Sequence, residues 1–197
     1  MAHHMYHTPG LVLSSRGVGE ANSLFSIFTR ELGMIEASAQ AVREVKSKLR
    51  FSLRDFSLTE LSLVRGKQGW KITSAVLESN FADISGAGSE MLRVAARIST
   101  LLQRMVAGEE KNDVLFDMIH SAFYFLATEP LSEEELANAE CIIVLSVLHE
   151  LGYLQDESTF QPFVGKVEWS RELVRSAAPF RTKIIAQINT SLRESQM

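Results

Sequence analysis

The sequence contains one cysteine, no long apolar run and no recognisable export signal. Cys141 is the only thiol among 197 residues, which excludes an intramolecular disulfide. Its neighbours in residues 141–145 are apolar, which favours a packing role over a catalytic thiol with a base beside it. No apolar run approaches the roughly 20 residues that cross a bilayer. Residues 1–10 also lack the apolar stretch and cleavage site of a secretory signal, so we expect a cytoplasmic protein and not a membrane protein.

The sequence also lacks the signatures of the common enzyme classes. The only candidate phosphate loop, Gly17–Gly19, is too short and is followed by Glu20, which would repel a phosphate. No Gly-x-Ser-x-Gly elbow exposes a nucleophile. The three histidines of residues 1–10 fit a frayed polar terminus better than a metal cluster, and the acidic residues 133–135 suit the start of a helix. We therefore predict no enzyme, no metal and no cofactor.

Charge is distributed unevenly along the chain. The formal net charge is −4, but up to Asn80 ten Lys and Arg residues face seven Asp and Glu residues. From Phe81 onward, ten basic residues face seventeen acidic ones. The first part is therefore positive and the second negative, and the positive part is where a polyanion would bind.

The first eighty residues have the pattern of a small β-domain. In residues 34–42, apolar Ile35, Ala37 and Ala39 alternate with polar residues, as in a strand with one wet face. Five short strands within about seventy residues fit a closed barrel, because closure removes exposed sheet edges. We predict an OB-type β-barrel domain over residues 1–80, with strands at 6–16, 24–28, 34–42, 56–64 and 70–77.

From Phe81 the apolar period changes from two to about 3.6, which predicts a helical domain over residues 81–197 and an α+β fold. Residues 85–89 are the expected hinge. Ser132 and Glu135 form a capping box for a helix that ends before Gly152. The other predicted segments are a helix from Ser89 to Gly108, one from Asn112 or Asp113 to Pro130, an irregular stretch or short ribbon over residues 153–167, and a helix from Ser170 broken at Pro179.

A basic run over residues 43–54, between the third and fourth predicted strands, carries five cations and one anion. Leu49, Phe51 and Leu53 are expected to anchor the run to the barrel while the cations face outward. This pattern suits sequence-independent contact with a phosphate backbone, although a solvated basic connector would have the same composition. The predicted DNA contacts are Arg43, Lys46, Lys48, Arg50 and Arg54, extended by Arg65 and Lys67 in the turn between the last two strands.

A second group of cations lies on the first long predicted helix. Arg93, Arg97 and Arg104 are spaced so that they share one face, opposite much of the apolar stripe. They are a candidate site for an acidic peptide or for DNA. A solvated polar face of an amphipathic helix is the other interpretation.

Several segments, in this order along the chain, resemble RecO proteins. The helical part is similar mainly through residues 116–130 and 148–154. The similarity in the first domain covers most of the barrel and rests on residues 8–16 (TPGLVLSSR), 19–22 (GEAN), 28–33 (FTRELG), 46–50 (KSKLR), 61–67 (LSLVRGK) and 73–79 (TSAVLES).

The resemblance implies a mediator of recombinational repair that is associated with the nucleoid. Such a protein binds single- and double-stranded DNA, promotes annealing, and works with RecR to help RecA replace single-strand-binding protein. It also engages the acidic tail of that protein, for which a groove near Arg93 and Arg97 is the candidate. Many RecO proteins carry a four-cysteine zinc module where this chain has residues 155–160, which contain no cysteine, so zinc is not predicted. A non-catalytic interaction adaptor built on the same barrel is the alternative.

Overall fold

The computed structural model describes residues 4–84, 89–106, 108–154, 158–165 and 168–194. Contacts divide the chain into two compact units, each made of two segments: Met1–Ile84 with Gln103–Phe116, and Ser85–Leu102 with Asp117–Met197. Of the predicted hinge, residues 85–89, only residue 89 belongs to the described part of the chain. The division into domains at residues 80 and 81 stays a prediction.

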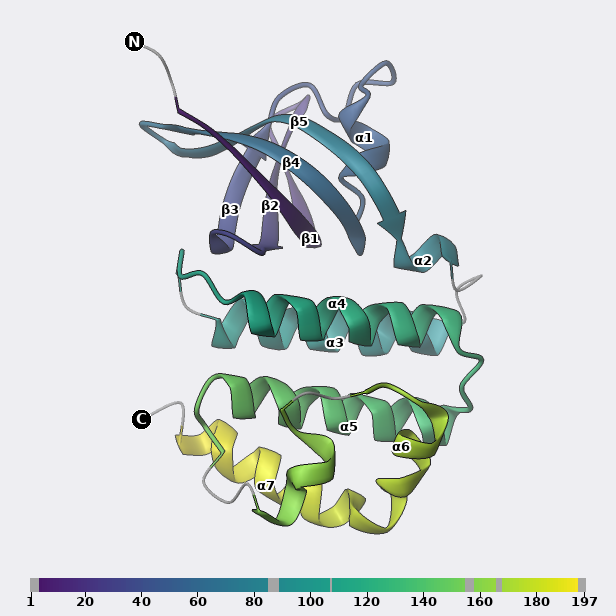
Figure 1. Ribbon diagram of the computed structural model, residues 1–197. Coiled ribbons are helices and arrows are strands. Elements are labelled where there is room, and N and C mark those ends of the chain that lie inside the picture. The colour runs from purple at the N-terminus through teal and green to yellow at the C-terminus, as the bar shows by residue number, and fades with distance from the viewer. Residues whose placement is uncertain (1–3, 85–88, 107, 155–157, 166–167, 195–197) are drawn as a thin grey trace. The chain divides into compact units, whose positions relative to one another are not determined.

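The first unit contains five strands: β1 (Met5–Val18), β2 (Asn22–Thr29), β3 (Gly33–Ala39), β4 (Ser57–Gly66) and β5 (Gly69–Asn80). They form a closed barrel in the order β1-β2-β3-β5-β4, in which β1 also pairs with β4 (Figure 1). All pairs are antiparallel except β3 with β5, which run parallel and share two partner pairs. Five strands and this order confirm the predicted α+β fold with an OB-type barrel.

Alternation decides which side chains fill the barrel. Ile35, Ala37 and Ala39 of β3 are buried while Glu36 is exposed, as the sequence pattern predicts. Gly10 of β1 permits close packing in the same core, because a Cβ atom there would lie within 3 Å of Leu61 and Ile27. The barrel core consists of Val12, Phe25, Ile27, Ile35, Ala37, Ala39, Val42, Leu53, Leu61, Leu63, Trp70 and Ile72.

Strand β5 departs from regular alternation after its fourth residue. Trp70 and Ile72 are buried, but Ser74, which regular alternation would place on the same face, is exposed. The pairing with β4 is irregular at this point, because Leu63 faces Ile72 while the preceding Ser62 faces Ser74. The extra residue in β5 is a β-bulge, which moves the side chains that follow it to the opposite face. A second irregularity, between Leu58 and Thr59 of β4, restores the original face, and Asn80 at the end of β5 is buried.

The basic run contains one helical turn, α1 (Leu49–Ser52), which overturns part of its predicted anchoring. Leu53 is buried and Leu49 packs half-buried against the barrel core, as expected. Phe51, however, is 65% exposed, so its predicted role as an anchor is wrong. Residues 49, 51 and 53 share a face only in a strand. In a helical turn each residue rotates by about 100°, which carries Phe51 away from the barrel.

The predicted helices are present: α3 (Ser89–Met105), α4 (Asp113–Thr128) and α5 (Glu133–Glu150), with a short turn α2 (Phe81–Ile84) after the barrel. The last predicted helix is broken as expected, into α6 (Arg171–Ser176), a 3₁₀ turn η2 (Ala178–Phe180) that contains Pro179, and α7 (Arg181–Glu194). Within the described residues no helix is both long and apolar enough to cross a bilayer.

Two local features of the second unit bear on the predictions. Residues 153–167 were expected to be non-helical, but they include a 3₁₀ helix, η1 (Ser158–Phe163). Burial of Phe160 and Phe163, and a bond from the Ser146 hydroxyl to the Phe163 carbonyl (2.9 Å), stabilise this turn. The predicted capping box of α5 is confirmed: the Glu135 N–H donates to Ser132 Oγ (3.2 Å) and the Ser132 N–H donates back to Glu135 Oε2 (2.9 Å).

Candidate nucleic-acid interface

A hollow of about 560 Å³ lies in the first unit, at the end of the barrel where the basic run begins and ends. It brings together three predicted DNA-contact residues, Arg43, Arg50 and Arg54, although they are separated by up to eleven positions in the sequence. The other lining residues are Ser15, Ser23, Phe25, Val42, Leu53 and Asp55. Three guanidinium groups outnumber the one carboxylate of the lining, Asp55, which accepts a hydrogen bond from the Ser15 hydroxyl (3.0 Å), so the hollow is suited to phosphate oxygens.

Backbone bonds hold both ends of the basic run on the barrel. At its start, the Arg43 N–H donates to the Ala21 carbonyl (3.0 Å), and the nearby Ala41 has a positive φ of 52°. At its end, the Phe56 N–H donates to the Val12 carbonyl (2.8 Å), and Phe56 also has a positive φ, of 65°. The left-handed conformation is unfavourable for both side chains, so the barrel contacts must stabilise these two turns.

Four cations of the run carry no neutralising carboxylate among the described residues. Arg43 Nη1 donates to the carbonyl of Gly19 (3.1 Å), a neutral acceptor, and Arg43 forms no ion pair with a described residue. Lys46, Lys48 and Arg50 are exposed, and none of them forms an ion pair with another described residue. These four side chains are therefore the part of the predicted DNA site with positive charge available to a ligand.

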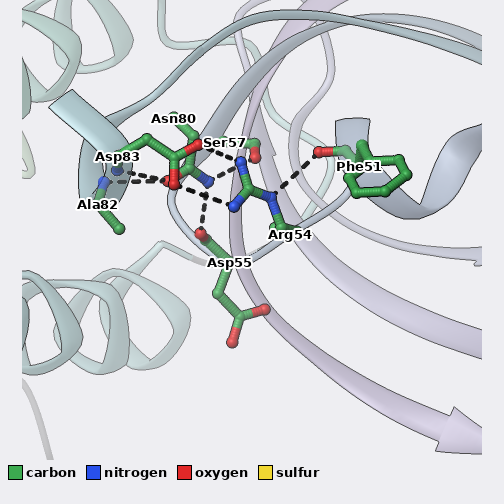
Figure 2. Close-up of polar contacts among 7 residues, drawn as sticks. All are labelled: Phe51, Arg54, Asp55, Ser57, Asn80, Ala82 and Asp83. Atoms are coloured by element: carbon green, nitrogen blue, oxygen red, sulfur yellow. Dashed lines mark hydrogen bonds and ion pairs between the residues drawn. The ribbon is translucent and has the colours of Figure 1, made fainter.

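Arg54 differs from these four cations, because its guanidinium forms an ion pair with Asp83 of α2. Arg54 Nη1 donates to Asp83 Oδ1 (3.0 Å), a second contact joins Nη2 to Oδ2, and Nε donates to the Phe51 carbonyl (3.4 Å), as Figure 2 shows. Asn80 supports the cluster by donating to the Asp55 carbonyl (3.0 Å). Arg54 thus ties α1 to α2 and lines the hollow with its charge largely compensated.

The ion pair shifts the pKa of both partners. The hydrogen bond from Arg54 lowers the pKa of Asp83, and the same bond raises the pKa of Arg54. Because the pKa of Asp83 is lower in the folded chain, its contribution to stability is complete above the ordinary pKa of an aspartate. It is lost as the pH falls through the folded-state pKa.

Arg65 and Lys67 do not join this hollow. Neither residue lines it: Arg65 lies near the end of β4, and Lys67 lies in the turn that follows this strand. Arg65 forms an ion pair with Glu109, and its guanidinium lies 5.1 Å from the centre of the Trp70 ring. Lys67 is exposed and forms no ion pair with a described residue. Their predicted DNA contacts stay predictions, as a surface separate from the hollow.

The arginines of α3 are largely neutralised by carboxylates that the sequence interpretation did not consider. Arg97 donates through Nε and Nη2 to both oxygens of Glu140 (2.6 and 2.7 Å), and Arg93 donates to Glu90 (2.8 Å). Arg104 is exposed without an ion pair to a described residue. An acidic tail would have to displace Glu90 and Glu140, and the predicted tail site stays a prediction.

Sequence reasoning missed Asp83, Asn80 and the exposure of Phe51. Asp83 lies 29 positions from Arg54, so no periodicity connects them. The signal that could have identified Phe51 was the basic composition around it, which favours a turn over a strand. Among the described residues, no group of three or more His, Cys, Asp or Glu side chains could hold a metal ion. Cys141 is half-buried, and burial raises the pKa of its thiol.

Replacing Asp83 by alanine should release Arg54 toward the hollow. We expect the affinity for single-stranded DNA to rise about threefold and the dependence of log affinity on log salt to steepen by about 0.7, the value for one further phosphate contact. Fluorescence anisotropy over a salt series measures both. Glu78→Ala is the matched control, since it removes an exposed carboxylate of the same barrel that pairs with no described cation. Equal effects of the two changes would show that only net charge matters.

Comparison with known proteins agrees with this barrel. Residues 1–81 match the family described as Recombination protein O N terminal. The chain is 30% identical over 156 residues to the DNA repair protein RecO of Heliobacterium modesticaldum, an alignment that covers 78% of this chain and 54% of that protein. The chain is 30% identical over 123 residues to the DNA repair protein RecO of Desulforamulus reducens, an alignment that covers 62% of this chain and 48% of that protein. The identity to RecO of Desulfitobacterium hafniense is 27% over 150 residues, which cover 76% of this chain and 52% of that protein.

The chain thus spans about half the length of these curated relatives. The matched family covers the whole OB-type barrel, including the hollow and the basic run. Residues 1–81 therefore belong to the family of RecO N-terminal domains.

Proposed function

We propose that this chain acts in DNA repair and homologous recombination as a non-catalytic mediator that binds single- and double-stranded DNA. The observation that carries the proposal is the set of four cations of the basic run, Arg43, Lys46, Lys48 and Arg50, that have no carboxylate partner in the part of the chain that the structure describes. Each cation that neutralises a phosphate releases condensed counterions, so such a surface binds DNA of any sequence.

Binding of this kind supports annealing. A basic surface that contacts only phosphates neutralises two complementary strands and leaves their bases free to pair. We further propose that the chain helps RecA load onto DNA coated with single-strand-binding protein, together with RecR, and that the acidic tail of the coating protein docks near Arg93 and Arg97. None of these steps forms or breaks a covalent bond, so no catalytic residue is proposed.

An interaction adaptor is the second candidate. The pairing of Arg54 with Asp83 and of Arg65 with Glu109 favours it, because these pairs leave fewer charges for DNA. In that case the unpaired cations would serve solubility, and the barrel would bind a protein.

The two candidates differ in how binding depends on salt. If the chain is a DNA mediator, labelled single-stranded DNA should bind with a log–log salt slope of about −3, the value for four phosphate contacts. Duplex DNA of equal length should also bind, and the chain should accelerate annealing of complementary strands. If neither DNA form binds at low salt, the mediator proposal is wrong and the adaptor is favoured.

A further inference from the structure

We propose that Phe51 stacks on an unpaired base and makes the basic run prefer single-stranded over double-stranded DNA. This inference rests on the proposed function, since Phe51 belongs to the same basic run, although its side chain is not among those that line the hollow. It assigns a specificity-determining role to a side chain that the sequence pattern had placed in the core.

Phe51 stands out among the aromatic side chains of the first unit. It is 65% exposed, whereas Phe25, Phe28, Trp70 and Phe81 are all buried. Within the described part of that unit, no other aromatic side chain is exposed to this degree. A phenyl ring exposed to water contributes little to the folded core and leaves its face accessible to a ligand.

The backbone on both sides of Phe51 is held in place. Arg54 Nε donates to the Phe51 carbonyl (3.4 Å), and the Thr59 hydroxyl donates to the carbonyl of the next residue, Ser52 (3.0 Å). Leu53, two residues on, is buried in the barrel core. In Figure 2 the ring extends away from the Arg54 side chain. A ring on an anchored backbone has only two side-chain torsions to restrict when it binds, which keeps the entropy cost small.

Charge identifies the occupant. Arg50 precedes Phe51 directly and lines the hollow, Lys48 lies two positions earlier, and neither forms an ion pair with a described residue. An exposed ring next to uncompensated cations is the combination that binds single strands, because the cations contact phosphates while the ring stacks on a base. In a duplex the base faces already stack on one another, so the ring has no free face to cover.

The test compares Phe51→Leu, which keeps an apolar side chain, with Phe51→Tyr, which keeps the ring. The ligands are oligo(dT) of about 15 nucleotides, the same strand with abasic sites, and a duplex of equal length. We expect Phe51→Leu to weaken oligo(dT) binding about tenfold while leaving the salt slope, the abasic strand and the duplex unchanged. Phe51→Tyr should bind like the original chain. Tyr124→Leu, which removes a 55% exposed ring from α4, is the matched control.

The proposal is overturned if Phe51→Leu binds oligo(dT) as tightly as the original chain, or if it loses equal affinity for all three ligands. In either case, a salt-dependent affinity that needs Arg43 and Arg50 would still support the proposed function. If the unsubstituted chain binds none of the ligands, both the proposed function and the role of Phe51 are wrong.

Discussion

Changing Arg43, Lys46, Lys48 and Arg50 together to alanine should weaken single-stranded DNA binding about a hundredfold near 0.1 M salt. These are the four cations of the basic run without a carboxylate partner among the described residues. Each phosphate contact on a single strand contributes about 0.7 to the log–log salt slope, so the slope should become shallower by about 3. Anisotropy titrations at several salt concentrations measure both quantities.

A matched pair separates position from net charge. Lys46→Ala/Lys48→Ala and Lys183→Ala/Arg193→Ala each remove two cations, but the second pair lies on α7. We expect the first pair to reduce the affinity and the slope, and the second to change little. If both pairs act equally, DNA binding depends on total charge, and the assignment to the basic run is wrong.

Gly33→Ala should destabilise the first unit by about 3 kcal/mol. Gly33 has a φ of +67°, and a Cβ atom there would lie 2.3 Å from the Glu110 carbonyl oxygen and 2.8 Å from its nitrogen. The left-handed conformation costs an alanine about 1 to 2 kcal/mol, and overlap in a packed site costs about 1 to 3 kcal/mol more. Both neighbouring atoms belong to the backbone, so no rotamer change removes the clash. Urea unfolding monitored by Trp fluorescence measures the loss.

Gly19→Ala provides the control for this change. Gly19 has nearly the same φ, +63°, but beyond its own chain neighbours no atom lies within 4 Å of the position that its Cβ would take. Gly19→Ala should therefore lower the free energy of unfolding only by the conformational cost of the left-handed backbone, about 1 kcal/mol. Equal losses at both positions would mean that residue 110 moves away from Gly33 at little cost.

Local patterns predicted most of the secondary structure because local energies decide it. Alternation located β3, and capping residues located the start of α5 at Ser132 and its end before Gly152, whose φ is +77°. The prediction failed where two periods competed. Residues 49–53 fit a strand by alternation, yet the chain forms a helical turn there and exposes Phe51. In β5 a bulge places Ser74 on the outer face. The sequence of one strand does not indicate where its pairing with the neighbouring strand becomes irregular.

For the candidate site, the sequence by itself determined the residue types and their concentration: a positive first part, a basic run between two strands, and segments that resemble RecO. Only the tertiary structure decided which charges are available. Asp83, Glu109 and Glu140 each neutralise an arginine at least 29 positions away, and barrel closure gathers Arg43, Arg50 and Arg54 around one hollow. Periodicity reports contacts over a few residues, whereas ion pairs and hollows depend on distances that only the packed chain defines.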